Sequence, residues 1–296
     1  PLNAGVDTLR RLDNTLGGQA VRGLVTEQLR LVIRLLRDSR YCEADGQQLH
    51  GLAAELARLA GWTSYDAGDH GAAQRYYLIA LRSAHEGDAA GIGANILRCM
   101  AHQARSLGDP ASAIDLLRSA KAGARGRLTA TERAAIHAGL ARAYGLTGDH
   151  SAAMSAADMA RADIEKAQPD EDPGYIYWVG HATIASAAGN ALLSTGRAQE
   201  AIPYLQDSVD LVGPDLPRDR LEYTTRLAVA YAVAGEPDEA ITLAHAAIGS
   251  IPIASTIVES HIGELDEALR TMAHPGGPQL IEHVRSLRHT DQTHPT

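Results

Sequence analysis

The sequence predicts an all-α protein built from a repeated pair of helices. Five copies of a glycine-containing turn occur along the chain, and small residues stand at fixed distances before and after each glycine. No segment alternates polar and apolar residues with the period of two that a half-buried strand shows. Alanine and leucine dominate the composition, phenylalanine is absent, and 45% of the residues are hydrophobic, which is enough for a core.

The five turns share one pattern of spacing. They read AGDHGAAQRYYLIAL (67–81), LGDPASAIDLLRSA (107–120), TGDHSAAMSAADMA (147–160), TGRAQEAIPYLQDS (195–208) and AGEPDEAITLAHAA (234–247). Their glycines are 40, 40, 48 and 39 residues apart: Gly68, Gly108, Gly148, Gly196 and Gly235. Alanine follows each glycine by five residues, at Ala73, Ala113, Ala153, Ala201 and Ala240. Repeats of this period are typical of helical solenoids.

Two further small positions flank each turn. One lies seven residues after the alanine (Ala80, Ala120, Ala160, Ser208, Ala247), and the other seven before the glycine (Gly61, Ala101, Ala141, Gly189, Ala228). Three small positions in fixed register indicate two antiparallel helices in close approach. The glycine suits the end of the first helix, and Asp, Pro or Ser suits the start of the second. A phosphate-binding loop is excluded, since no copy matches G-x-x-x-x-G-K-[ST] and five such sites would be needed.

The repeat resembles the tetratricopeptide repeat. Ala141, Tyr144, Gly148, Ala153 and Ala160 match its pattern well, although the period exceeds the usual length of that repeat. A narrower resemblance is carried by LAAELARLAGWTSYDAGDHGAAQRYYLIALRSAHEGD (52–88), ILRCMAHQA (96–104), YIYWVGHA (175–182) and RRLDNTLGGQAVRGL (10–24). These segments are similar to actinobacterial transcription regulators, in which a lambda-repressor-like helix-turn-helix precedes a tetratricopeptide sensor. The resemblance implies the sensor part of such a regulator or a stand-alone relative.

The chain is expected to form one superhelical domain over residues 1–288. Residues 3–16 and 19–37 are predicted as helices separated by Gly17 and Gly18, within an N-terminal part, 1–47. SRYCEA (39–44) is interpreted as a degenerate turn whose second helix runs into the next repeat. Clear repeats occupy 48–248, a terminal repeat and capping helix 249–288, and a disordered tail 289–296. QPDEDPG (168–174) is interpreted as a solvated connection that lengthens one interval, and GPDLP (213–217) as a second linker.

Composition excludes several kinds of function. The net charge is −9 without a basic run, so we expect no direct nucleic-acid binding by this chain. No apolar stretch is long enough to span a membrane, and we expect a cytoplasmic protein. The thirteen histidines form no metal-binding pattern, so we expect no metal and no cofactor. Cys42 and Cys99 are predicted to be reduced buried thiols. No catalytic signature indicates an enzyme.

The candidate site is the concave face of the solenoid. The tetratricopeptide register implies that the first helix of each pair lines it, and polar side chains recur there at helical spacing. They are Glu55, Arg58, Trp62 and Tyr65; Asn95, Arg98, His102 and Arg105; Arg142; Thr183, Ser186 and Asn190; Glu222 and Thr225. Asn can bind peptide amides, Arg binds carboxylates with two hydrogen bonds, and Trp offers an apolar wall. A simply solvated helix face is the alternative.

The sequence therefore predicts a tetratricopeptide sensor of a transcription regulator. The expected partner in the groove is a short peptide, a small acidic ligand or a partner protein, with DNA reached only through a separate N-terminal domain. A stand-alone protein–protein adaptor is the alternative, and an enzyme on a helical-repeat scaffold a distant third. The sequence leaves a homodimer open.

Overall fold

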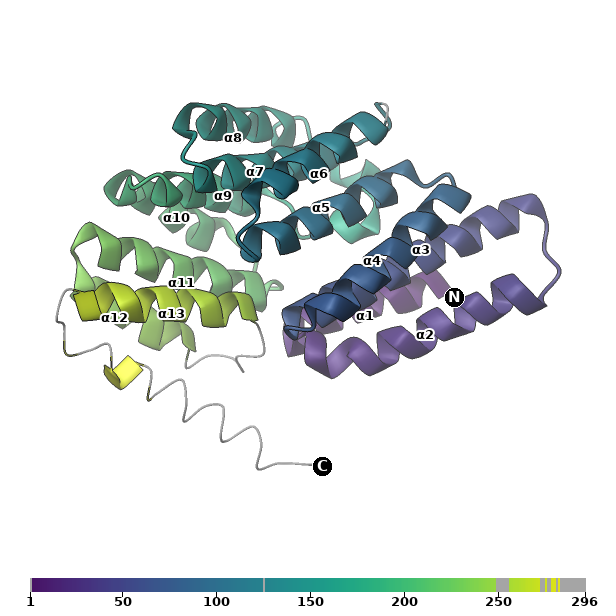
Figure 1. Ribbon diagram of the computed structural model, residues 1–296, viewed down its shortest axis with the longest axis horizontal. Coiled ribbons are helices and arrows are strands. Elements are labelled where there is room, and N and C mark those ends of the chain that lie inside the picture. Colours follow the sequence, from purple (N-terminus) through teal and green to yellow (C-terminus); the bar gives the residue numbers. More distant parts are fainter. Residues whose placement is uncertain are drawn as a thin grey trace.

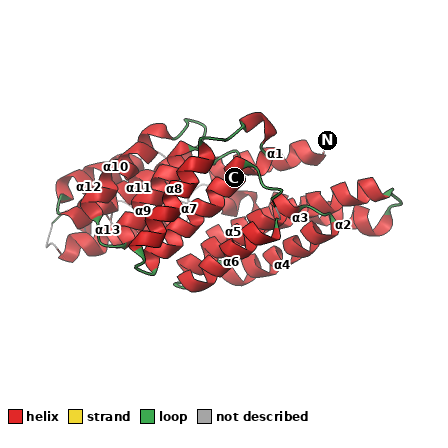
Figure 2. Cartoon of the chain, turned by 90° about the horizontal axis from the view of Figure 1, so that it is seen from above, coloured by secondary structure: helices red, strands yellow, loops and turns green. Residues whose placement is uncertain are grey.

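The computed structural model describes residues 2–124, 126–248, 256–271, 275, 278–280 and 282, which form helices joined by turns and short loops. No strand occurs in these ranges. The helices stack side by side into a curved solenoid, with the N-terminal helices at one end and the last helices at the other (Figures 1 and 2). The predicted all-α repeat architecture is confirmed.

Five antiparallel helix pairs form the body of the solenoid. They are α3 (Glu43–Asp66) with α4 (His70–Glu86), α5 (Ala90–Ser106) with α6 (Pro110–Gly123), α7 (Ala130–Leu146) with α8 (His150–Ile164), α9 (His181–Ser194) with α10 (Ala198–Leu211), and α11 (Pro217–Ala234) with α12 (Pro237–Ile248). A further helix, α13 (Thr256–Thr271), packs against α11. The loop over residues 212–216 between α10 and α11 agrees with the second predicted linker.

The repeated glycine ends the first helix of each pair. All five glycines have positive φ, between 77° and 92°, a conformation that side chains with a Cβ rarely adopt. In three copies the next residue begins the second helix by capping it: Asp69, Asp109 and Asp149 each accept a hydrogen bond from a backbone N–H three residues later, at 2.9–3.0 Å. The turn is therefore a helix–helix corner, as the sequence predicts.

The conserved spacing of small residues lets the paired helices touch. The alanine that follows each glycine by five residues is at most 1% exposed in all five copies. A Cβ added to Gly61 would lie 2.5 Å from the ring of Tyr77, and one added to Gly189 would lie 2.6 Å from Leu205. Two of the five pairs thus approach so closely that only glycine fits without rearrangement.

The N-terminal part consists of α1 (Leu2–Leu16) and α2 (Gly18–Asp38), which join at Gly17. The next helix, α3, is one continuous helix of 24 residues that packs on α2 and then on α4, in agreement with the helix predicted to run into the next repeat. The expectation that both cysteines are buried is wrong for Cys42, which precedes α3 and is exposed, whereas Cys99 is buried.

The predicted capping helix and the tail lie mostly outside the described residues. Leu280, one of its predicted apolar positions, is fully buried in the core cluster of the last two helix pairs. The predictions for 283–296 concern residues that the structure does not describe.

Helix α1 leaves the N-terminal end of the stack and meets α11, the first helix of the fifth pair (Figure 1). The side chain of Asn14 donates a hydrogen bond to Asp219 at 2.6 Å, across 205 residues of sequence. Arg218 donates to the backbone oxygen of Asp13 at 3.0 Å and forms an ion pair with Asp66 of α3. These contacts close the concave side of the solenoid at one edge.

Candidate functional site

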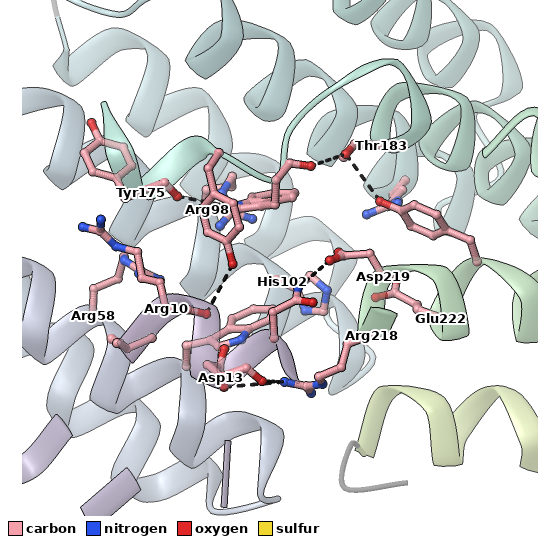
Figure 3. Close-up of a pocket in the computed structure, with 17 residues that line it drawn as sticks. Arg10, Asp13, Arg58, Arg98, His102, Tyr175, Thr183, Arg218, Asp219 and Glu222 are labelled. Atoms are coloured by element: carbon pink, nitrogen blue, oxygen red, sulfur yellow. Dashed lines mark hydrogen bonds and ion pairs between the residues drawn. The ribbon is translucent and has the colours of Figure 1, made fainter. Parts of the chain in front are cut away.

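Two adjoining cavities occupy the concave side. The first has a volume of about 130 Å³ and is lined by α1, α3, α5, α7, α9, α11 and the segment between α8 and α9 (Figure 3). The second, of about 340 Å³, is lined by α3, α4, α5, α7, α9, α11 and α13. Both cavities share His102, Arg142 and Glu222, so these three side chains stand at their junction.

Most of the residues predicted for the groove line these cavities. Arg58, Trp62, Arg98, His102, Arg142, Thr183 and Glu222 line the first. Tyr65, His102, Arg105, Arg142, Asn190 and Glu222 line the second. The indole of Trp62 meets the edge of the His102 ring, with centroids 5.3 Å apart. Side chains from the first helices of all five pairs are therefore brought together.

Several of the predicted residues are paired with other side chains of the protein. Glu55 lines neither cavity and forms ion pairs with Arg58 at 2.6 Å and Arg10 at 2.9 Å. Although burial favours its protonation, these two guanidinium groups hold the pKa of Glu55 below its ordinary value. The Glu55–Arg58 pair accordingly belongs to the wall of the cavity.

The polar residues farther along the groove also carry internal bonds. The side-chain oxygen of Asn95 accepts from Arg98 at 2.9 Å, and that of Asn190 accepts from Arg226 at 2.6 Å. Ser186 accepts from Arg142 at 2.9 Å, whereas the hydroxyl of Thr225 is buried against its own helix. Asn95, Asn190 and Ser186 therefore orient the arginines.

Three arginines at the cavities have no carboxylate partner among the described residues: Arg98, Arg105 and Arg142. Arg98 lies over the ring of Trp178, 4.7 Å from its centroid, and donates to Asn95. All three side chains are half-buried, and what remains exposed of them lines the cavities. Burial, together with the charge of Arg142, lowers the pKa of Arg105 to about 10, and burial also lowers the pKa of Arg98.

The same region contains buried polar atoms that lack hydrogen-bond partners. They include Nε of Arg142 and Nδ1 of His102 and of His261, which belongs to α13. Burial, reinforced by the neighbouring arginines, lowers the pKa of both histidines well below its ordinary value. His102 is consequently neutral at neutral pH and does not add a further cation. A buried polar atom without a partner is costly, and a ligand group that bonded to these three atoms would remove that cost.

The segment between α8 and α9 contributes aromatic residues that the sequence analysis did not assign to the site. Residues 168–171 are exposed, in line with the predicted solvated connection. The chain then turns inward, so that Tyr175 is buried and Tyr177 and Trp178 line the first cavity. The sequence did carry a signal for this part of the site, because YIYWVGHA has three of the chain's few aromatic residues within four positions.

Residues of α1 and α11 also form the site without having been predicted. Arg10, Asp13 and Asn14 line the first cavity from α1, and Arg218, Asp219 and Tyr223 line it from α11. Burial raises the pKa of Asp219 to about 6, helped by the negative charge of Glu222, and burial raises the pKa of Asp13 to a similar value. Figure 3 shows Asp219 and Glu222 projecting from α11 at one side of the cavity, with Arg58 at the opposite side.

The described residues contain neither a metal-ligand cluster nor a membrane-spanning helix. Among the described residues, no three His, Cys, Asp or Glu side chains are grouped as a metal ion requires. His137 of α7 is bonded to Asp163 at 2.8 Å and to Lys121 at 3.0 Å. None of the described helices is both long and apolar enough to cross a membrane.

Comparison with known proteins gave structural matches alone. No protein-family model and no curated protein matches the chain. BtubC (BKLC) from P. vanneervenii matches with a TM-score of 0.51 and 16% identity, over 75% of this chain and 89% of that one. A signal transduction ATPase with a tetratricopeptide repeat sensor from Pyrococcus horikoshii matches with a TM-score of 0.53 and 12% identity, over 92% of this chain and 41% of that one.

A crystal structure of tetratricopeptide-like repeats named for a kinesin light chain of Podosopora anserina aligns with 67% of this chain, at 22% identity and a TM-score of 0.43. The two matches with higher TM-scores establish the architecture. The chain has the fold of a tetratricopeptide-like helical-repeat solenoid.

Proposed function

We propose that this solenoid is a sensing domain that binds a small acidic ligand or a short peptide in its two cavities. The fold is one used for protein interaction and for sensing. The observation that carries the proposal is the group of Arg98, Arg105 and Arg142, which line the cavities and have no carboxylate partner in the described part of the chain.

Elsewhere along the cavity walls, arginines do have such partners. Arg58 pairs with Glu55, Arg218 with Asp66, and Arg226 with Glu264. A buried charge without a partner is destabilising, whereas a ligand carboxylate would supply charge-assisted hydrogen bonds to the same guanidinium groups. Trp62 and Trp178 offer apolar surface beside them. The site therefore suits an anion that also has an apolar portion.

Calorimetry with two matched probes tests this proposal. We expect N-acetyl-Leu-Phe, which carries a carboxylate, to bind at least about tenfold more tightly than its neutral amide, because an arginine–carboxylate pair out of water contributes about 2–5 kcal/mol. Arg105→Gln should abolish the difference. Arg118→Gln should preserve it, since Arg118 is exposed on α6. Equal affinities of the wild type for both probes would contradict the proposal.

The regulatory context rests on the sequence resemblance. We propose that ligand binding here is communicated to a DNA-binding helix-turn-helix domain N-terminal to the solenoid. α1 suits this role, because it contacts both α3 and α11 and lines the first cavity. The test is to examine the coding sequence upstream of Pro1, and then to measure operator binding by the whole protein with and without N-acetyl-Leu-Phe. A protein that lacks such a domain would be the stand-alone adaptor instead.

A further inference from the structure

The first cavity is lined by carboxylates that have no cationic partner among the described residues, and by arginines that have no anionic partner there. Asp219 and Glu222 lie one turn apart on α11 and both line it, as do Arg98 and Arg142. Neither carboxylate forms an ion pair with any described residue. Asp219 accepts a hydrogen bond from Asn14 at 2.6 Å. Two groups of opposite charge thus line one cavity and remain unpaired.

The two groups come from different parts of the fold. The arginines belong to α5 and α7, of the second and third helix pairs, whereas both carboxylates belong to α11, of the fifth pair. Asn14 of α1 donates a hydrogen bond to Asp219. Around the same wall, Arg10 and Arg58 enclose Glu55, and Arg218 joins Asp13 and Asp66. The other charged side chains of this wall are thus paired, whereas these two groups form no ion pair among the described residues.

Aromatic groups line the same cavity as the two charged groups. Trp62, Tyr177, Trp178 and Tyr223 line the first cavity along with the acidic and basic residues. Aromatic faces beside carboxylates suit an ammonium group, which they attract through cation–π interaction. The volumes of about 130 and 340 Å³, together with the closure of one edge by α1, favour a compact ligand over an extended chain.

We propose that the ligand is a compact zwitterion, with an anionic group bound by Arg98, Arg105 and Arg142, an ammonium group bound by Asp219 and Glu222, and an apolar middle between Trp62 and Trp178. This inference rests on the proposed function and specifies its ligand. The pKa shifts of Asp219 and Arg105, at the two ends of the proposed ligand, agree with this assignment. Burial and Glu222 raise the pKa of Asp219, and burial and Arg142 lower the pKa of Arg105, so a ligand charge of opposite sign would relieve both.

The test adds the unblocked dipeptide Leu-Phe to the two probes above. We expect the zwitterion to bind at least about tenfold more tightly than N-acetyl-Leu-Phe, since the acetyl group removes the cation that Asp219 and Glu222 would bind. Glu222→Gln should reduce that preference to about twofold or less by weakening Leu-Phe alone, with N-acetyl-Leu-Phe unaffected. A residue that only supported the fold would change both affinities. Glu239→Gln, an exposed acid on α12, is the matched control.

The outcomes separate the two proposals. If N-acetyl-Leu-Phe binds as tightly as Leu-Phe while the amide does not bind, the zwitterion inference fails and the anionic site stands. If Glu222→Gln weakens both carboxylate probes equally, the zwitterion inference fails as well. If none of the three probes binds at millimolar concentration, both proposals fail.

Discussion

Arg105 of α5 and Glu222 of α11 line the same 340 Å³ cavity, yet no ion pair joins them. They belong to the first helices of different repeats, the second and the fifth. The charge of Glu222 nevertheless opposes the lowering of the Arg105 pKa that burial causes. The protein therefore keeps two half-buried charges with no ion pair between them, which is costly for stability and useful for binding.

Removing the charge of Arg105 should stabilise the ligand-free protein. Because burial lowers its pKa to about 10, the charged form is disfavoured in the folded state relative to the unfolded state. Solvent in the cavity screens this charge and reduces the effect. Arg105→Gln should therefore add about 1 kcal/mol to the free energy of unfolding and raise Tm by about 2–4 °C. Differential scanning calorimetry measures the change. Arg118→Gln should stay within about 0.5 kcal/mol of the wild type. A fall in Tm for Arg105→Gln would show that its charge is satisfied by contacts within the protein.

The pH dependence of Asp219 follows from the sign of its shift. Its pKa rises from 3.8 in the unfolded chain to about 6 in the folded protein, so the folded state binds the extra proton between these values. Stability from this group is therefore present near pH 4 and is lost as pH rises through 6. We expect Asp219→Asn to raise Tm at pH 7.5, with a free-energy gain of about 1 kcal/mol after solvent screening, and to have little effect at pH 4.5. Equal shifts at both pH values would contradict this assignment.

The repeat unit was predictable because each of its signals is local. A left-handed glycine, a capping Asp and three small residues at fixed spacing act within about 20 residues of sequence, and the spacing repeats. Gly148, Asp149 and Ala153 thus have the conformation, the cap and the burial that the pattern predicts. The spacing of three and four residues also brought Arg98 and His102 to one side of α5.

The contacts between α1 and α11, which close one edge of the concave side, could not be predicted from local signals of this kind. The bond from Asn14 to Asp219 joins residues 205 positions apart, and no period in the sequence relates α1 to α11. Likewise, helical spacing placed Glu55 and Arg58 on the predicted concave face, but it did not indicate that they pair with each other and with Arg10 of α1. Whether a charged side chain is free to bind a ligand depends on such distant partners, which helical periodicity does not specify.

Arg218 should be the residue on which the closure by α1 depends. Its guanidinium joins Asp66, which is 1% exposed, to Asp13 and to the backbone of α1. Arg218→Ala leaves these buried carboxylates without that cation, which typically costs about 3–5 kcal/mol. We expect faster amide hydrogen exchange in α1 and a lower urea midpoint. Thr15→Ala, which alters an exposed residue of α1 whose hydroxyl bonds to its own helix, is the control. Unchanged exchange in α1 for Arg218→Ala would mean that α1 is held by its apolar contacts.

The close approach of α3 and α4 can be tested with a pair of glycine substitutions. In Gly61→Ala the new Cβ would lie 2.5 Å from a ring carbon of Tyr77, which is fully buried and cannot move aside without displacing its neighbours. Overpacking of this kind costs about 1–3 kcal/mol. Gly23→Ala makes the same chemical change inside α2, where nothing lies within 4 Å of the new Cβ. There the higher helix propensity of alanine should add up to about 1 kcal/mol to the free energy of unfolding. Urea unfolding of both variants should therefore move the midpoint in opposite directions, and a stabilised Gly61→Ala would show that the two helices can separate without loss of packing.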